Sequence, residues 1–296
     1  MSGAAPDATL PMTANKHSLG RDALRRLRHN RAAMAGVFLL LLILLLAFVG
    51  PFFNNNAYDS LDWAFFGSPP TLTNDHWFGT DVVGRDLFVR TLYGARISLM
   101  VGVVATAVAL LIGVTYGSVA GYVGGKTDDV MMRIVDVIYS LPFMFFVILL
   151  MVVFGKNILL IFVAIGAVEW LTMARIVRGQ TLSLKQREFV EAARASGLSD
   201  LQIIVTHIVP NVMGPVIVYV TLTIPQVILA ESFLSFLGLG VQEPMTSWGV
   251  LISDGASQME DAPWMLLFPA SFLAITLFCF NFIGDGLRDA LDPRDR

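Results

Sequence analysis

The sequence predicts an all-α integral membrane protein with about six transmembrane helices, and three observations support this fold class. Of the 296 residues, 55% are hydrophobic and only 15% are charged, whereas soluble domains carry about 25% charged residues. The mean hydropathy of +0.69 spreads this apolar excess over much of the chain. Several apolar runs reach the roughly 20 residues that a helix needs to cross a bilayer. The composition therefore argues against a soluble or a disordered protein.

The first and clearest apolar run covers residues 32–53. It is too long for the apolar region of a signal peptide, and it ends in Pro51, Phe52 and Phe53 in place of a small-residue cleavage site. Three prolines fall inside the later spans and predict bends there: Pro142, Pro225 and Pro269. The further predicted spans are 97–122, 130–154, 158–177, 212–237 and 265–283.

The distribution of Lys and Arg predicts the orientation of the spans. Sixteen of the 20 basic residues fall in the N-terminal segment 1–31, the second and fourth connections, and the tail 287–296. The other side holds Arg85, Arg90, Arg96 and Lys156, and its last loop, 238–264, contains no basic residue. Because cytoplasmic loops are rich in Lys and Arg, both termini are predicted to be cytoplasmic.

The two outer connections differ in character. The first, 54–93, is predicted to hold either a short amphipathic helix over 85–93, lying on the outer surface, or an ordered loop. Both alternatives stay open. In the second connection Trp248 and Trp264 are expected to be anchors at the membrane interface.

The chain shows no catalytic or cofactor motif of its own. Residues 121–127 resemble a phosphate-binding loop, but only three residues separate Gly121 from the Gly125-Lys126 pair, and the segment follows a span where the motif requires a strand. The four histidines are scattered, and the single cysteine, Cys279, cannot form an intramolecular disulfide. We therefore expect a chain that is not an enzyme and that binds no cofactor.

The connection between the fourth and fifth spans predicts a helical hairpin. Residues 185–196 contain good helix formers, and Gly197 can adopt the left-handed conformation that ends a helix. Ser199 and Gln202 have the spacing of a capping box, and Pro210 is expected to end the second helix. The small side chains near residue 193 suit close docking of another protein, but a helix resting on lipid headgroups fits equally well.

This hairpin resembles the "EAA loop" of permease subunits in ATP-binding-cassette importers. The shared pattern is Glu191-Ala192-Ala193, three residues, Gly197, nine residues, and a segment that ends in Pro210. The family commonly has isoleucine at the position of His207 and leucine at that of Val209. A histidine there, followed by Pro210 and Asn211, is similar to the peptide-importer branch.

Further segments resemble that branch, so that the likeness extends over nearly everything from Arg31 onward. They resemble the C-type permease subunits of bacterial oligopeptide importers and lie at 78–86 (FGTDVVGRD), 94–99 (GARISL), 233–242 (FLSFLGLGVQ) with 247–249 (SWG), and 284–293 (GDGLRDALDP).

The resemblance implies a fold, a location and partners. The fold would be the type I importer permease in the bacterial inner membrane, with a first helix over 32–53, a periplasmic loop over 54–93, and a core over 94–286 that contains a coupling loop over 178–211. A B-type permease would pair with the chain, and two cytoplasmic subunits would bind ATP and Mg²⁺. A periplasmic or lipid-tethered protein would deliver peptide. Membrane lipid would surround the spans of this chain, and no nucleic acid is expected among its partners.

The resemblance also implies roles for the hairpin residues 185–211 in alternating access driven by the ATPase subunits. Ala192 and Ala193 would permit close docking on an ATPase, Glu191 would pair with a basic group or cap locally, and Gly197 would set the turn. Pro210 and Asn211 would join the hairpin to the fifth span, and His207 would belong to the same set of ATPase-coupling residues.

Ionisable residues within spans usually face a cavity or a partner. Glu169 and Glu231 are therefore expected either to line the peptide path or to make structural hydrogen bonds, and Asp136 is expected to be structural. Two other classes find less support: a lone secondary transporter would need paired halves, and an intramembrane enzyme would need a nucleophile and base or a histidine cluster. Within the family, a dipeptide, nickel or other small-solute permease stays the alternative.

Overall fold

The computed structural model describes residues 19–155 and 157–291, and this part of the chain is almost wholly helical. A single isolated β-bridge joins Thr80 and Asp86 in the described residues. The helices are α1 (Leu19–His29), α2 (Arg31–Val49), the 3₁₀ segment η1 (Gly50–Phe53), α3 (Leu87–Val123), α4 (Gly125–Tyr139), α5 (Phe143–Phe154), α6 (Ile158–Leu184), α7 (Glu188–Ala195), α8 (Asp200–Ile203), the π-helical segment η2 (Ile204–Ile208), α9 (Val209–Phe236), α10 (Trp248–Ser257) and α11 (Trp264–Leu291).

The described residues contain five helical segments long and apolar enough to cross a membrane, or six if the bent pair α4 and α5 forms one span. This agrees with the predicted number of about six. The third span was expected to be one helix over 130–154, but the axes of α4 and α5 differ by 78°. Pro142 explains the break, because proline lacks an N–H and disfavours helix in the residue before it. Pro225 and Pro269 lie inside α9 and α11 without ending them.

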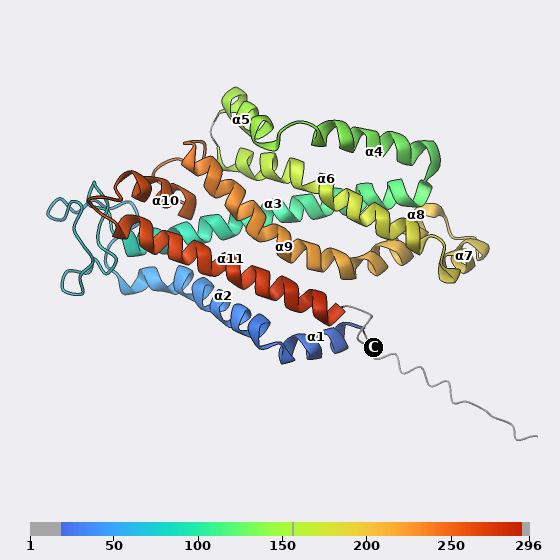
Figure 1. Cartoon of the computed structure of the whole chain (residues 1–296), viewed down its shortest axis with the longest axis horizontal. Coiled ribbons are helices and arrows are strands. Elements are labelled where there is room, and N and C mark those ends of the chain that lie inside the picture. The colour runs from blue at the N-terminus through green and yellow to red at the C-terminus, as the bar shows by residue number, and fades with distance from the viewer. Residues whose placement is uncertain (1–18, 156, 292–296) are drawn as a thin grey trace, which may run out of the picture.

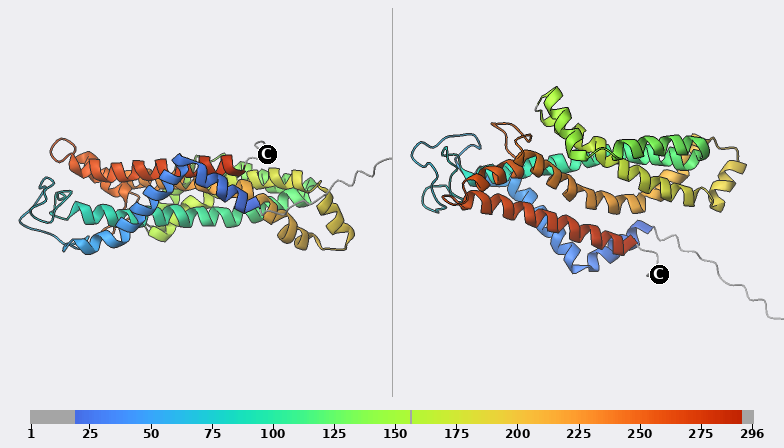
Figure 2. Two further views of the ribbon diagram at one scale, coloured as in Figure 1. Left: turned by 90° about the horizontal axis from the view of Figure 1, so that it is seen from below. Right: turned by 45° about the horizontal axis from the view of Figure 1, so that its top comes forward.

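The helices form an elongated bundle around α3 (Figure 1). α6 and α9 pack against α3, while α2 and α11 lie side by side along another face. The loop 54–86 and α10 lie at one end of the bundle, and α1, α7 and α8 lie at the other end (Figure 2). The structure therefore separates an outer-loop end from a hairpin end.

Three glycines on α3 set the contact with α6. Gly113, Gly117 and Gly121 recur every four residues and so lie on one face of the helix. A methyl group on Gly117 would overlap the carbonyl oxygen of Ala174, and one on Gly121 would lie 2.8 Å from the carbonyl oxygen of Arg178. Small residues at this spacing let two helix backbones approach closely in a membrane.

The outer connection 54–86 is ordered, and α3 begins immediately after it. The side chain of Asp86 accepts a hydrogen bond from the Val89 N–H and caps α3, which then runs unbroken to Val123. A separate surface helix over 85–93 is therefore wrong, since residues 87–93 form the first turns of the second span. Arg90, in those turns, is fully buried.

An ion pair joins the two outer loops. Arg85 donates a hydrogen bond to Asp81 at 2.6 Å and another to Glu243 at 2.8 Å. The hydrogen bond from Arg85 lowers the pKa of Glu243. The pair therefore stabilises the loops at neutral pH, and this stabilisation is lost as the pH falls through the lowered pKa of Glu243.

The expected interface anchors have different positions. Trp248 is fully buried, and its indole N–H donates to the Thr91 carbonyl oxygen at 3.0 Å. It is therefore a core residue, and its prediction as an interface anchor was wrong. Trp264 is half-buried and donates to the Thr80 carbonyl oxygen at 3.2 Å.

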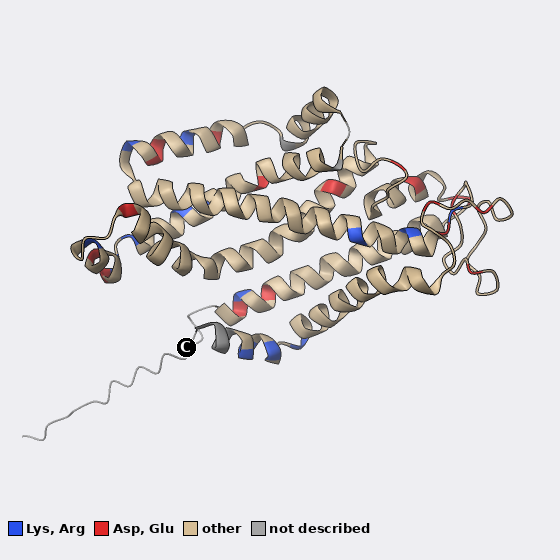
Figure 3. Cartoon of the chain, turned by 180° about the vertical axis from the view of Figure 1, so that it is seen from behind, with Lys and Arg blue, Asp and Glu red and all other residues tan. Residues whose placement is uncertain are grey.

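Charged residues gather toward the two ends of the bundle, and few lie along its length (Figure 3). Basic residues mark α1, α4, the end of α6 and α7. Four of the basic residues counted from the sequence lie outside the described residues: Lys16, Lys156, Arg294 and Arg296.

Replacing Gly117 by Ala tests the glycine contact between α3 and α6. The added methyl group would meet the Ala174 carbonyl oxygen, so we expect G117A to lower the free energy of unfolding by about 1–3 kcal/mol. The matched control is G179A, because the space around Gly179 on the exposed face of α6 is open. There the better helix propensity of alanine should raise stability by about 0.5–1 kcal/mol. Thermal unfolding in detergent measures both, and equal effects would contradict the close contact.

Candidate functional site

The segment that follows α6 forms the predicted hairpin at one end of the bundle (Figure 1). α7 leads into Gly197, whose φ of +83° is the left-handed value expected of it. The Ser199 side chain accepts from the Gln202 N–H, and the Gln202 side chain accepts from the Ser199 N–H. The turn and the capping box of the sequence prediction are therefore confirmed.

The helix limits differ from the predicted ones. α6 continues to Leu184, so the first hairpin helix begins only at Glu188. Pro210 was expected to end the second helix, which was wrong: helical structure continues from Asp200 to Phe236. The π-helical segment Ile204–Ile208 precedes the proline, and the Asn211 side chain donates to the His207 carbonyl oxygen at 2.6 Å. The wider turn lets helical structure continue through the proline, which has no N–H to donate.

The two alanines of the predicted motif face opposite environments. Ala193 is buried and packs with Val190 against the second arm of the hairpin, where Ile203 and Ile208 are also buried. Ala192 is exposed. Because Cβ atoms of consecutive helical residues point about 100° apart, one alanine supports the hairpin while the other is open to a partner.

Tyr122, at the end of α3, ties the hairpin to the bundle. Its side chain is buried, and its hydroxyl donates to Asp200 Oδ1 at 3.1 Å. Arg194 of α7 donates to the same hydroxyl at 3.2 Å, and this hydrogen bond raises the pKa of Arg194. The Arg194 guanidinium and the Lys185 ammonium each lie 5.8 Å from the tyrosine ring centre. Sequence analysis missed Tyr122 because 66 or more residues separate it from the hairpin helices.

The remaining predicted residues lie on the outer side of the hairpin. Glu191, Gly197, Pro210 and Asn211 are exposed. His207 is half-buried, and its ring centre lies 6.3 Å from that of Phe189, so these two side chains bridge the arms.

Besides Ala192, the two arms of the hairpin carry exposed apolar side chains. Phe189 is 38% exposed, Leu201 69% and Val205 60%. Such side chains at the end of a bundle, beside acidic Glu188 and Glu191, form a surface suited to a protein partner. We name Phe189, Ala192, Leu201 and Val205 the hairpin face.

Ion pairs brace α4 against α6 next to the hairpin. Arg178 donates to both oxygens of Asp128, at 2.5 and 2.6 Å, in a bidentate pair. Arg175 donates to Asp136 at 2.8 Å and stacks over Tyr139 at 4.2 Å. Asp136 thus bonds to a neighbouring helix, as expected of a structural residue.

The two carboxylates predicted for the spans have different surroundings. Glu231 is fully buried, and the hydroxyls of Ser235 and Ser247 each donate to its Oε1 at 2.7 Å. Ser98 donates to its Oε2 at 3.5 Å. Glu169 is half-buried on α6, and no hydrogen bond to it occurs among residues 19–155 and 157–291.

The apparent phosphate loop is a turn between helices. Gly124 and Gly125 have φ of +72° and +56° and connect α3 to α4. Across the described part of the chain, no three His, Cys, Asp or Glu side chains gather in a way that could hold a metal ion.

Comparison with known proteins places this geometry in a family. Residues 113–296 match the family of binding-protein-dependent transport system inner membrane components. Residues 18–70 match the N-terminal transmembrane domain of oligopeptide transport permease C. A chain of the inward-facing MetNI methionine ABC transporter shares the fold, with a TM-score of 0.54 at 20% identity over 69% of this chain and 96% of that one.

Curated relatives match over nearly the whole chain. The oligopeptide transport system permease protein OppC of Escherichia coli K12 is 62% identical over 94% of this chain and 92% of its own length. OppC of Haemophilus influenzae is 58% identical over 96% and 92%. The dipeptide transport system permease protein DppC of Bacillus subtilis is 50% identical over 94% and 87%. The chain therefore belongs to the binding-protein-dependent inner membrane components, the permease subunits of ATP-binding-cassette importers.

Proposed function

We propose that this permease carries oligopeptides, forms half of the translocation path beside a B-type permease, and couples to a cytoplasmic ATPase through the hairpin 185–211. The observation that supports the cargo is the identity of 58–62% to two OppC proteins over more than nine-tenths of the chain. The observation that supports coupling is the hairpin face, which is apolar, exposed and supported from behind by a buried cluster.

Dipeptides are the second candidate cargo. DppC of Bacillus subtilis is 50% identical, about the same as the 49% of OppC from that organism. Purifying the complex with its binding protein and identifying the bound ligand by mass spectrometry tests the cargo. Peptides longer than two residues would support the proposal, and dipeptides alone would contradict it.

The partners follow from the orientation that the charges suggest. With both termini and the hairpin in the cytoplasm, ATP and Mg²⁺ would bind on two ATPase subunits and not on this chain. The joined outer loops would then receive a periplasmic or lipid-tethered peptide-binding protein.

In the proposed alternating-access mechanism, the hairpin transmits movement of the ATPase subunits to the spans. Closure of the ATPase dimer on ATP would move the hairpin face, and Tyr122 and the buried cluster would transmit this movement to α3, α6 and α9. The spans would open outward to receive peptide, and hydrolysis would return them inward. Small Ala192 would allow close docking, Glu191 would pair with a basic group, and Gly197 would fix the angle between the arms.

Of the two carboxylates within spans, we assign Glu169 to the peptide path and Glu231 to structure. Glu231 is surrounded by three serine hydroxyls from α3, α9 and the start of α10. Glu169 is half-buried and has no such partner among the described residues. A carboxylate facing a wet path would remain partly hydrated, which lowers the cost of its position.

Replacing Ala192 by Trp tests docking directly. A bulky side chain on the hairpin face should keep the ATPase at a distance, so A192W should weaken co-purification of the ATPase about tenfold, or about 1.4 kcal/mol, without changing thermal stability. The control T127W places the same side chain on an exposed site of α4 at the same end. Equal ATPase recovery in A192W and T127W would contradict docking at the hairpin face.

Removing the Tyr122 hydroxyl tests whether α3 stiffens the hairpin. Y122F loses the hydrogen bonds to Asp200 and Arg194, each worth about 1 kcal/mol. Amide hydrogen exchange over 188–203 should therefore accelerate at least fivefold. The control Y139F removes a hydroxyl that bonds to nothing in the described part of the chain. Unchanged hydrogen exchange over 188–203 in Y122F would contradict the claim that Tyr122 stabilises the hairpin.

The two carboxylates should respond differently to alanine. E231A leaves three buried hydroxyls without their acceptor, which should cost about 3 kcal/mol of stability. E169A should unfold at the wild-type temperature but transport peptide more slowly in proteoliposomes. Thermal unfolding and uptake of labelled peptide measure the two effects. Normal peptide uptake by E169A would contradict the assignment of Glu169 to the peptide path.

A further inference from the structure

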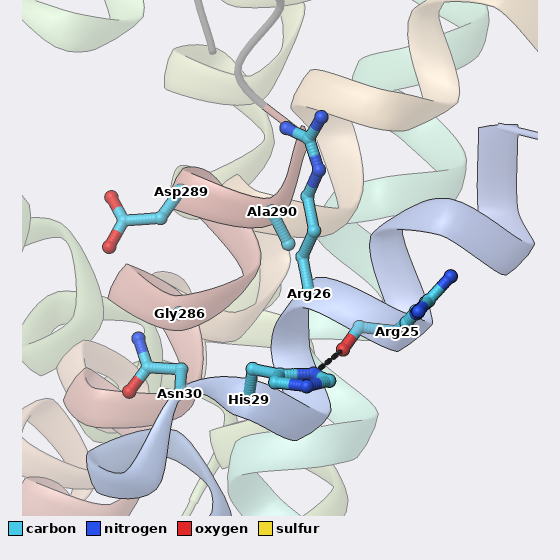
Figure 4. A pocket seen from close by; sticks show the side chains of 7 residues that line it. All are labelled: Arg25, Arg26, His29, Asn30, Gly286, Asp289 and Ala290. Atoms are coloured by element: carbon cyan, nitrogen blue, oxygen red, sulfur yellow. Dashed lines mark hydrogen bonds between the residues drawn. The ribbon is translucent and has the colours of Figure 1, made fainter. Parts of the chain in front are cut away.

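Two pockets lie beside α11, and neither offers convergent polar groups to a peptide. One, of about 670 Å³, lies between α1 and α11, and the side chains of Arg25, Arg26 and Asn30 in it point in different directions (Figure 4). The other, of about 410 Å³, lies between α2 and α11 and is lined by apolar side chains and Gly36. Polar side chains converge instead between α6 and α9.

The contact between α6 and α9 is apolar toward both of its ends and polar between them. One buried cluster joins residues 161–165 of α6 to residues 227–234 of α9. Another joins residues 173–177 to residues 212–216. Glu169 lies between the two clusters and is the first charged residue along α6. A polar gap therefore interrupts the seam between these two spans.

Three side chains that carry oxygen atoms meet in this gap. Thr172 follows Glu169 by about one turn of α6, so the two lie on the same face of the helix. Tyr219 of α9 hydrogen-bonds to the Thr172 side chain and interacts electrostatically with the Glu169 carboxylate. All three side chains are half-buried, so a ligand can reach them from the open side of the seam. We name Glu169, Thr172 and Tyr219 the acceptor cluster.

The carboxylate of this cluster has no cation within the part of the chain that the structure describes. The next basic residues along α6 are engaged elsewhere, since Arg175 pairs with Asp136 at 2.8 Å and Arg178 pairs with Asp128. No ion pair to Glu169 occurs among residues 19–155 and 157–291. Carboxylates within spans usually pair with an opposite charge or line a path. A cation that neutralises Glu169 therefore has to come from another molecule.

An ammonium group has the chemistry that this cluster accepts. It carries one positive charge and three N–H donors, and it has no acceptor atom. The cluster provides one carboxylate and two hydroxyl oxygens, all of which accept hydrogen bonds. Every linear peptide with a free N-terminus carries an ammonium group there, whatever its side chains, and a lysine side chain carries another. Contact with such a group would let one path accept peptides of many sequences.

We propose that Glu169, Thr172 and Tyr219 form a transient binding site for an ammonium group of the passing peptide. This inference rests on the proposed transport of peptides and adds which part of the cargo the permease contacts. The site holds a single charged group and no side-chain pocket, so binding stays weak enough for release. A transport path requires such weak binding, because a tightly held ligand would not leave.

Peptide uptake by the complete complex in proteoliposomes tests the site. Labelled trialanine and its N-acetyl derivative are each supplied at a concentration that saturates the binding protein. We expect E169Q to slow uptake of trialanine about tenfold, or about 1.4 kcal/mol, as for a hydrogen bond to a charged group. Uptake of N-acetyl-trialanine, which lacks the ammonium group, should be the same in E169Q and wild type. T172V and Y219F should each slow uptake of trialanine alone, by about threefold.

A third peptide separates the two sources of an ammonium group. N-acetyl-Ala-Lys-Ala has no free N-terminus but carries a lysine. If wild type takes it up faster than N-acetyl-trialanine and E169Q does not, the cluster accepts any ammonium group of the cargo. If both acetylated peptides enter equally slowly, the cluster accepts the N-terminus alone.

Matched controls separate this site from a general effect of charge. D129N removes an exposed carboxylate of α4 and should keep the wild-type ratio between free and acetylated peptide. Thermal unfolding of each variant checks that it is folded. A second measurement needs no uptake of acetylated peptide: a pentapeptide with a photo-reactive group at its first residue should crosslink to residues 165–176 during turnover more often than one labelled at its last residue.

Two results would overturn the proposal and leave peptide transport itself intact. One is equal slowing of free and acetylated trialanine by E169Q, because Glu169 would then act without contact to an ammonium group. The other is carbodiimide coupling of Glu169 to a lysine of the partner permease, because the cation would then belong to the transporter. Failure of the wild-type complex to take up any peptide would instead contradict the proposed function.

Discussion

The close contact between α3 and α6 is the constraint on which the other parts of the structure depend. Gly113, Gly117 and Gly121 bring the two backbones together, and no larger residue fits where Gly117 meets Ala174. This contact fixes the position of the last turn of α3, where Tyr122 holds the hairpin. It also brings Arg178 to the bidentate pair with Asp128 that braces α4. The hairpin face therefore stands on two closely packed helices, as the coupling proposed above requires.

Much of this architecture could be predicted from sequence because it rests on local physics. Apolar runs of membrane length identify the spans, and the spacing of Ser199 and Gln202 identifies a helix start. Gly197 marks the turn because glycine adopts a positive φ without strain. The family resemblance added the proposed use of that hairpin, since neither its helix propensity nor its charge could separate a docking surface from a helix on lipid headgroups.

The features that sequence reasoning missed depend on contacts between distant residues. Tyr122 is an ordinary aromatic residue in a span until α7 and α8 fold against it. Trp248 is of the residue type expected of an interface anchor, but its indole N–H donates to the Thr91 carbonyl oxygen and the side chain lies in the core. Ala192 and Ala193 are identical in sequence, and only the packing of Val190 and Ile203 decides which one faces outward. Pro210 signals a helix end, yet the preceding π-turn carries the helix through it.

The central claim is that the hairpin moves as one body with α3. Its most direct test is the distance between spin labels on two exposed sites, Ser196 after α7 and Val123 at the end of α3, in the complex with the buried Cys279 replaced by alanine. Double electron–electron resonance should give one narrow distance distribution that is the same without nucleotide and with trapped ATP. A distribution that shifts or broadens when ATP is bound would contradict the account, because the hairpin would then flex against α3 and could not transmit the movement of the ATPase.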